Sequence, residues 1–149
     1  MFDLLLRHIN AEQYAAHAYR ALASWADANG YPGLRGWADA ASEEEQRHAL
    51  VFIAFARTRG LVRLLPLDAP PDVGDYAAAL EAALTIERGV AASLEALAQA
   101  GDEAAAQLAG DYLLTEQWPA IHAIEIYLLK ARRSTDLDLL DAELFEEGA

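Results

Sequence analysis

The sequence predicts an all-α fold: a four-helix bundle with one long crossover between helices two and three and a short C-terminal helix. The chain is rich in Ala and Leu and poor in β-branched residues, which favours helix. Four long segments repeat apolar residues with the 3.6-residue period of a helix packed on a core. The chain has 149 residues, the size of one ordinary domain, so we expect a single domain over 1–149 with the bundle at about 3–133.

The first two helices are predicted to form an antiparallel pair. The first runs from Asp3, a residue type that caps helix N-termini, to the helix stop Asn29-Gly30. The second begins after Pro32-Gly33 and ends at Arg59-Gly60. Because only a few residues join them, the two helices should lie side by side.

Residues 61–74 form the long connection, and their prolines argue against helix there. Fully extended, a segment of this length spans roughly 45 Å. A helix of about 27 residues is roughly 40 Å long. The connection can therefore cross the whole length of the bundle, which allows the second and third helices to be parallel.

The third and fourth helices are predicted at about 75–101 and 102–133. Pro119 interrupts the fourth, where an interior proline costs on the order of 3 kcal/mol. We expect it either to kink the helix or to begin a fresh helical segment. An amphipathic tail at about 136–146 is predicted to form the short fifth helix.

Charge and cysteine content exclude several classes of protein. The net charge of −13 and the pI near 4.5 argue against nucleic acid as a partner and against an anionic membrane surface. No apolar stretch approaches the length of a membrane span. The absence of cysteine excludes thiolate metal sites and iron–sulfur clusters. The apolar run at the N-terminus is too short for a signal peptide, so we expect a cytoplasmic protein.

Each predicted core stripe carries polar residues near its middle: Glu12, then Glu45 with His48, then Glu87, then Gln117. An ionised carboxylate in an apolar interior is very costly unless it is paired or bound to a cation. Glu45 and His48 are three residues apart, so both project from one helix face. Oxygen donors with a single imidazole suit iron or manganese. The pattern predicts a metal site, although a salt bridge at the bundle edge would explain any one of these acids alone.

In these residues the chain resembles the bacterial non-haem ferritins over essentially its whole length. The strings that carry the resemblance, in order, are Asn10-x-Glu12 with Tyr19, Glu44-Glu45-x-x-His48, Glu87 within Ala-Leu-Thr-Ile-Glu-Arg, and Glu116-Gln117. The long connection resembles the crossover of that family, and residues 140–144 resemble its C-terminal helix. The resemblance implies the ferritin-like bundle fold.

By this resemblance, Glu12, Glu45 and His48 would hold a first iron ion. Glu45 would bridge to a second iron ion held by Glu87, with Gln117 alongside. His8 lies one turn before Glu12 and is expected either at the surface or beside the ligands rather than among them.

The same resemblance implies roles for residues around the two iron ions. Tyr19 would sit beside the first iron, as a transient electron donor or as a core aromatic whose hydroxyl finds a carboxylate. Glu44 and Glu116 would belong to a third, transit site. Ala120 stands where a carboxylate or histidine would be expected, so the second iron site should be weak or rearranged and the third largely missing.

The resemblance implies a ferroxidase and iron store. Two Fe ions per subunit would be oxidised from Fe(II) to Fe(III) by O2 or hydrogen peroxide, and the product would be stored as mineral inside a homo-oligomeric shell of twenty-four subunits. Haem of the bacterioferritin kind is not expected, because Met1 is the sole methionine. The alternatives are a di-metal oxidase or peroxidase without storage, and a bundle that binds metal only for structure.

Overall fold

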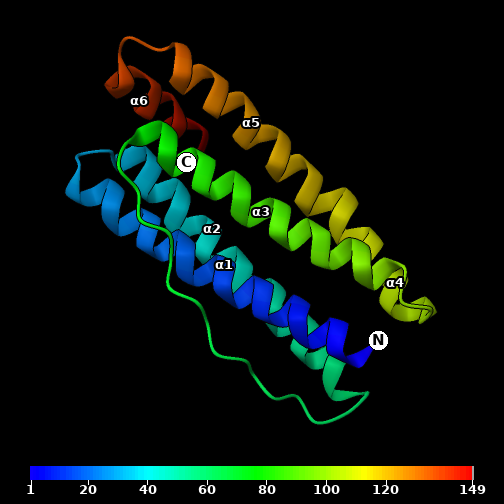
Figure 1. Cartoon of the computed structure of the whole chain (residues 1–149). Coiled ribbons are helices and arrows are strands. Elements are labelled where there is room, and N and C mark those ends of the chain that lie inside the picture. Colours follow the sequence, from blue (N-terminus) through cyan, green and yellow to red (C-terminus); the bar gives the residue numbers. More distant parts are fainter. Residues whose placement is uncertain (149) are drawn as a thin grey trace.

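The computed structural model describes residues 1–148, and these residues form helices and no strand. The elements in chain order are α1 (Phe2–Ala28), α2 (Pro32–Arg57), α3 (Tyr76–Ala98), α4 (Glu103–Tyr112), the π-helical turn η1 (Leu113–Gln117), α5 (Trp118–Arg133) and α6 (Leu137–Gly148). The long elements make four rods, because α4, η1 and α5 follow one another without a break and together form the fourth rod. Figure 1 shows the rods side by side. This confirms the predicted four-helix bundle with a short C-terminal helix. Among these residues no helix combines the length and the apolar character that a bilayer crossing requires.

Tight turns join α1 to α2, as the sequence predicted, and α3 to α4. Gly30 has φ +79° between α1 and α2, and Gly101 has φ +80° between α3 and α4. This left-handed conformation is open to glycine at little cost, which explains why both helices stop there. Asp75 caps the start of α3 and Asp102 caps the start of α4. Each side chain accepts a hydrogen bond from the backbone N–H group three residues further along the chain. Asp3, predicted as the cap of α1, instead lies in its first turn.

Residues 58–75 carry the chain from the end of α2 to the start of α3. Figure 1 shows this segment running along the outside of the bundle from one end to the other, so that α2 and α3 point the same way. At the end of α2, Arg59 forms an ion pair with Asp102 at 3.3 Å, which ties the start of the crossover to the start of α4. The predicted crossover is confirmed.

The fourth rod contains a feature that the sequence did not predict. The helix widens into the π-turn η1, in which the N–H of Trp118 bonds to the carbonyl of Leu113, five residues back. Pro119 follows in the first turn of α5. A missing N–H costs little at the start of a helical segment, so the π-turn accommodates the proline within one nearly continuous rod. The second of the two expectations for Pro119, a fresh helical segment, is the one observed.

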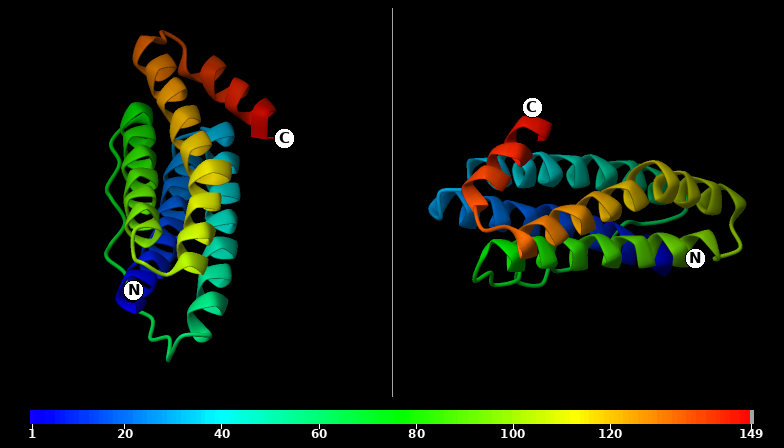
Figure 2. Two further views of the ribbon diagram at one scale, coloured as in Figure 1. Left: turned by 90° about the vertical axis from the view of Figure 1, so that its right-hand side faces the viewer. Right: turned by 90° about the horizontal axis from the view of Figure 1, so that it is seen from above.

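The short helix α6 crosses the end of the bundle and packs against α2, as Figure 2 shows. Its Asp141 is 3% exposed and accepts hydrogen bonds from the backbone N–H groups of Gly33 at 2.7 Å and Leu34 at 2.8 Å. The hydroxyl of Tyr76 donates to the same carboxylate at 3.0 Å. One buried side chain therefore caps the N-terminus of α2, where the helix dipole favours negative charge, and holds three elements together.

Replacing Asp141 by Ala should destabilise the protein by about 2–4 kcal/mol, because two buried backbone N–H groups and a buried phenol would lose their acceptor. Urea unfolding at neutral pH measures the change. The exposed Asp138→Ala variant, on the same helix, should cost less than about 1 kcal/mol. Equal stabilities for the two variants would contradict the role given to Asp141.

Candidate metal centre

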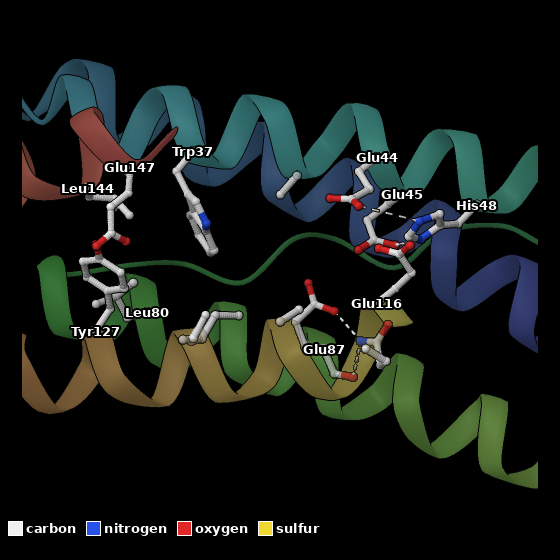
Figure 3. A pocket seen from close by; sticks show the side chains of 15 residues that line it. Trp37, Glu44, Glu45, His48, Leu80, Glu87, Glu116, Tyr127, Leu144 and Glu147 are labelled. Carbon is white, nitrogen blue, oxygen red and sulfur yellow. Dashed lines mark hydrogen bonds and ion pairs between the residues drawn. The ribbon is translucent and has the colours of Figure 1, made fainter. Parts of the chain in front are cut away.

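A layer of polar side chains crosses the middle of the bundle, with apolar core on either side. Glu12 is fully buried, and Glu45, Glu87 and Gln117 expose only 3–4% of their surface. They come from α1, α2, α3 and η1, so each rod supplies one member. Figure 3 shows Glu45 of α2 and Glu87 of α3 facing each other across the space between the rods.

Hydrogen bonds between α1 and α2 fix the two helices close to this layer. The hydroxyl of Ser42 is fully buried and donates to the carbonyl of Ala16 at 2.7 Å, while Arg20 donates to Ser42 at 3.2 Å. Ser42 is three residues before Glu45 and Ala16 is four residues after Glu12. A shift of one helix along the other would break these bonds, so they hold Glu12 and Glu45 at the same height.

Glu12, Glu45 and His48 form the inner trio, which can supply one ligand atom each with all three atoms within 4.8 Å of one another. His48 Nδ1 lies 3.2 Å from Glu45 Oε2 and 3.9 Å from Glu12 Oε2. Both oxygens of Glu12 are buried without a hydrogen-bond partner. Buried polar atoms nearly always have a partner, so these oxygens indicate that one is missing. A cation with a preference for oxygen and imidazole donors, such as Fe(II), fits that position.

Glu44, His48 and Glu116 form a second group, the outer trio, whose ligand atoms also lie within 4.8 Å of one another. It is closer to solvent, since Glu44 and Glu116 are only partly buried. His48 belongs to both trios and turns Nδ1 to the inner one and Nε2 to the outer one, where Glu44 Oε1 is 3.9 Å away. Tyr112 packs edge-on against the imidazole with ring centroids 5.0 Å apart, which fixes this orientation.

Glu87 lies outside both trios, and neighbours hold it on each side. The hydroxyl of Tyr19 donates to Glu87 Oε1, and Gln117 Nε2 donates to Glu87 Oε2 and, at 2.9 Å, to its carbonyl oxygen. Gln117 therefore uses its amide N–H groups to orient Glu87 and keeps its amide oxygen free. Tyr19 packs edge-on against Trp37 at 5.5 Å, which keeps its ring in place.

Burial strongly disfavours the ionised forms of these acids. It raises the pKa of Glu45 to about 8 and that of Glu87 to about 7, and it also raises the pKa values of Glu12 and Glu44. Burial alone would lower the pKa of His48, but the adjacent carboxylates, Glu45 foremost, outweigh it and raise that pKa. The metal-free site therefore retains protons at neutral pH, and a cation that binds there must displace them.

A cavity of about 260 Å³ extends from these acids between α2 and α5 towards α6. All residues of the two trios other than Glu12 line its acidic end, and Glu87 lines it as well. Apolar side chains and Glu147 of α6 line the other end (Figure 3). Ala120 lies in the cavity wall and offers no ligand atom there. At this position α5 therefore adds no metal ligand next to Glu87.

His8 is the residue whose place was least well predicted. It is fully buried, so the expectation that allowed it at the surface is wrong, and the position beside Glu12 is the one observed. Its Nε2 lies 3.0 Å from Glu12 Oε1, and burial lowers its pKa to about 3. The four-residue spacing from Glu12, which places both on one helix face, was the signal in the sequence.

Comparison with known proteins identifies the family of the chain. Residues 2–133 match the family model of the ferritin-like domain. The chain belongs to the ferritin family. Over 97 residues it is 40% identical to the ferritin heavy chain of Echinococcus granulosus, a match that spans 61% of this chain and 56% of that protein. It therefore covers little more than half the length of this relative.

Ferritins are also found among the solved structures that resemble this one. An open-pore ferritin from the hyperthermophilic archaeon Archaeoglobus fulgidus is 30% identical, with a TM-score of 0.88 over 97% of this chain and 95% of that chain. A humanized archaeal ferritin is 29% identical, with a TM-score of 0.89 over 97% and 93% of the two chains. These similarities confirm the ferritin resemblance and the ferritin-like fold inferred from the sequence.

The metal-free protein should lose stability as the pH rises from about 5 to 8. Glu45 ionises near 4.5 when unfolded and near 8 when folded, so between these values the folded state binds more protons. The free energy of unfolding then falls by up to about 1.4 kcal/mol per pH unit for this group alone. Urea unfolding of chelator-treated protein across this range measures the slope. Glu45→Gln should flatten it, and a stability that rises with pH would contradict the assignment.

Proposed function

We propose that this ferritin stores iron and is a ferroxidase, with the inner trio binding Fe(II) for oxidation by O2 or hydrogen peroxide. The observation that carries the proposal is the fully buried carboxylate of Glu12, whose oxygens have no hydrogen-bond partner and lie beside Glu45 and His48. Membership of the ferritin family supports iron storage as the general function. Iron is thus the substrate and the cargo of the protein.

We assign the first Fe(II) to Glu12, Glu45 and His48. Glu45 and Glu87 line the same cavity, and after burial the charge of Glu45 is the main cause that raises the pKa of Glu87. We therefore propose that Glu45 bridges to a second Fe(II) held by Glu87. Gln117 would orient Glu87 and could offer its amide oxygen. Since Ala120 adds no ligand, we propose that the second ion is bound more weakly than the first.

The residues of the site favour Fe(III) over Fe(II). Carboxylates in a poorly hydrated layer stabilise the more highly charged ion more strongly, so ionisation of Glu12, Glu45 and Glu87 assists the loss of an electron. Two Fe(II) ions together supply the two electrons that, with two protons, reduce O2 to hydrogen peroxide. We propose that Tyr19, whose hydroxyl donates to Glu87, is close enough to act as a transient electron donor.

We propose that the outer trio is a transit position. Glu44 and Glu116 lie between the inner trio and solvent, and they share His48 with it. Their partial exposure suits ions that stop only briefly, because the cost of leaving water is smaller there. Iron would pass through this position on its way to the mineral.

Exposed apolar residues support a homo-oligomer. On α2, Leu50 is 65% exposed, and on the crossover Leu64 is 58% exposed, with Leu65 and Leu67 also exposed. They gather around one surface hollow between α1, α2 and the crossover. Apolar patches of this kind mark protein–protein contacts. We propose that copies of the chain pack here within a twenty-four-subunit shell in the cytoplasm.

A structural role for the metal is the alternative that one observation favours. Ala120 leaves the second position short of a ligand, and Glu87 is already held by Tyr19 and Gln117. A bundle that binds a single ion tightly would stabilise the fold without oxidising iron in pairs. Oxidation kinetics separate this alternative from the ferroxidase.

Glu45→Ala should abolish rapid Fe(II) oxidation, with a loss of at least about tenfold, because it removes both a ligand of the first ion and the bridge to the second. Stopped-flow absorbance and O2 consumption after addition of Fe(II) measure the rate. The control is Glu43→Ala, an exposed acid two residues away, which should oxidise iron at the wild-type rate. An unchanged rate in Glu45→Ala would remove the proposed bridge.

The assembled protein should have a mass of about 390 kDa, that of twenty-four 16.2 kDa chains. Size-exclusion chromatography with light scattering measures it. Leu64→Arg should reduce the mass to that of small oligomers, because a charge buried in a subunit contact without a partner is costly. Circular dichroism verifies that the variant remains helical. A wild-type dimer would favour the oxidase without storage.

A further inference from the structure

His8 is a buried polar neighbour of the inner trio that has no role in the function proposed so far. It lies one turn before Glu12 on α1, and its side chain is fully buried. Its Nε2 is 3.0 Å from Glu12 Oε1, yet the two atoms are not aligned for a hydrogen bond and neither has another partner. Leaving two buried polar atoms unpaired costs free energy, so their proximity calls for an explanation.

The ring of His8 is held in place from two other helices. On α3, Ser93 Oγ lies 2.7 Å from His8 Nδ1. On α2, Phe52 packs edge-on against the imidazole with ring centroids 4.2 Å apart. The imidazole therefore cannot turn away from Glu12 without breaking contacts on both sides.

The direction of the Ser93 hydroxyl decides which ring nitrogen of His8 carries the hydrogen. Its Oγ lies 2.7 Å from the carbonyl of Val90 as well as 2.7 Å from His8 Nδ1, and its single hydrogen can go to only one of them. When Ser93 donates to Nδ1, neutral His8 carries its hydrogen on Nε2 and points it towards Glu12. That arrangement suits the ionised carboxylate, which is the form that binds a cation.

The two oxygens of Glu12 face different neighbours. Oε1 faces His8 at 3.0 Å, and Oε2 faces His48 Nδ1 at 3.9 Å. A small rotation of the carboxylate would align Oε1 with the N–H of His8. That bond would occupy Oε1 and leave Oε2 directed towards the ion position of the inner trio.

We propose that the Ser93–His8 pair is a positioning element, which holds Glu12 by Oε1 so that it binds metal through Oε2 alone. The proposal rests on the proposed function only in requiring that the inner trio bind a divalent ion. His8 acts through Glu12 and is not itself a ligand. Partners of this kind orient metal-binding carboxylates and commonly change affinity by 10–100-fold.

The test measures Co(II), a stand-in for Fe(II) that is stable in air, by calorimetry and by its visible absorption. His8→Phe keeps a ring in the same space but removes both nitrogens, and should weaken Co(II) binding about tenfold or more and alter the absorption bands. His8→Gln can place an amide N–H near Oε1 and should remain within about threefold of wild type. Ser93→Ala should lie between the two. The control is His17→Gln, an exposed histidine on the same helix, which should bind Co(II) as wild type does.

Three results would overturn the proposal. His8→Phe could bind Co(II) with the wild-type affinity and spectrum, in which case the side chain only fills space. Electron spin-echo spectroscopy of bound Cu(II) could detect two coordinated imidazoles, which would make His8 a ligand. His8→Gln could be as weak as His8→Phe, which would show that an N–H directed at Glu12 is not what matters.

The experiment also separates this proposal from the one on which it rests. If the wild-type protein binds no Co(II), the inner trio and the positioning role fail together. If the wild type binds and the variants bind equally well, the positioning role alone fails. Should His8→Phe not fold, Ser93→Ala decides, since an unchanged affinity in that variant overturns the proposal and a weakened one with wild-type thermal stability supports it.

Discussion

The cost of placing carboxylates in an apolar bundle governs this structure. Glu12, Glu45 and Glu87 sit where ordinary packing would place Leu, and burial raises the pKa of each. Hydrogen bonds offset this cost for some of these acids and not for others. Glu87 has two hydrogen-bond donors, whereas the oxygens of Glu12 have none. The acid that lacks partners is therefore the one best prepared to bind a cation.

The fourth rod shows how backbone irregularity serves the same layer. A regular helix through Pro119 would lose a hydrogen bond in its interior. The π-turn just before it adds one residue to a single turn and leaves Gln117 buried, with its amide against Glu87. π-turns often occur at functional sites because they redirect one side chain while the rest of the helix is preserved. Here that side chain belongs to Gln117, and it orients Glu87.

The fold and the polar layer could be predicted from the sequence because they depend on periodic patterns, whereas the grouping of Glu12 with Glu45 and His48 was implied by the ferritin resemblance. Apolar spacing gives the helices, and the spacing of Glu45 and His48 gives a shared face. The π-turn could not be predicted, because it depends on how α4 and α5 pack against α3. Asp141 was also missed, since its partners at the start of α2 are more than 100 residues away. His8 was only half predicted because its burial requires Ser93 and Phe52, which come from other helices.

The two trios share the imidazole of His48. A neutral imidazole has one lone pair available for a metal, yet Nδ1 faces the inner trio and Nε2 the outer one. If an ion in the inner trio binds the imidazole, the outer trio has only Glu44 and Glu116 left as ligands. If an ion in the outer trio binds it, the inner trio has only Glu12 and Glu45. Glu12 and Glu45 are the more deeply buried acids, so a bound cation stabilises their ionised forms most. We therefore expect the ion in the inner trio to bind the imidazole first. The outer trio is then left with two partly exposed carboxylates, which is consistent with the transit position proposed for it.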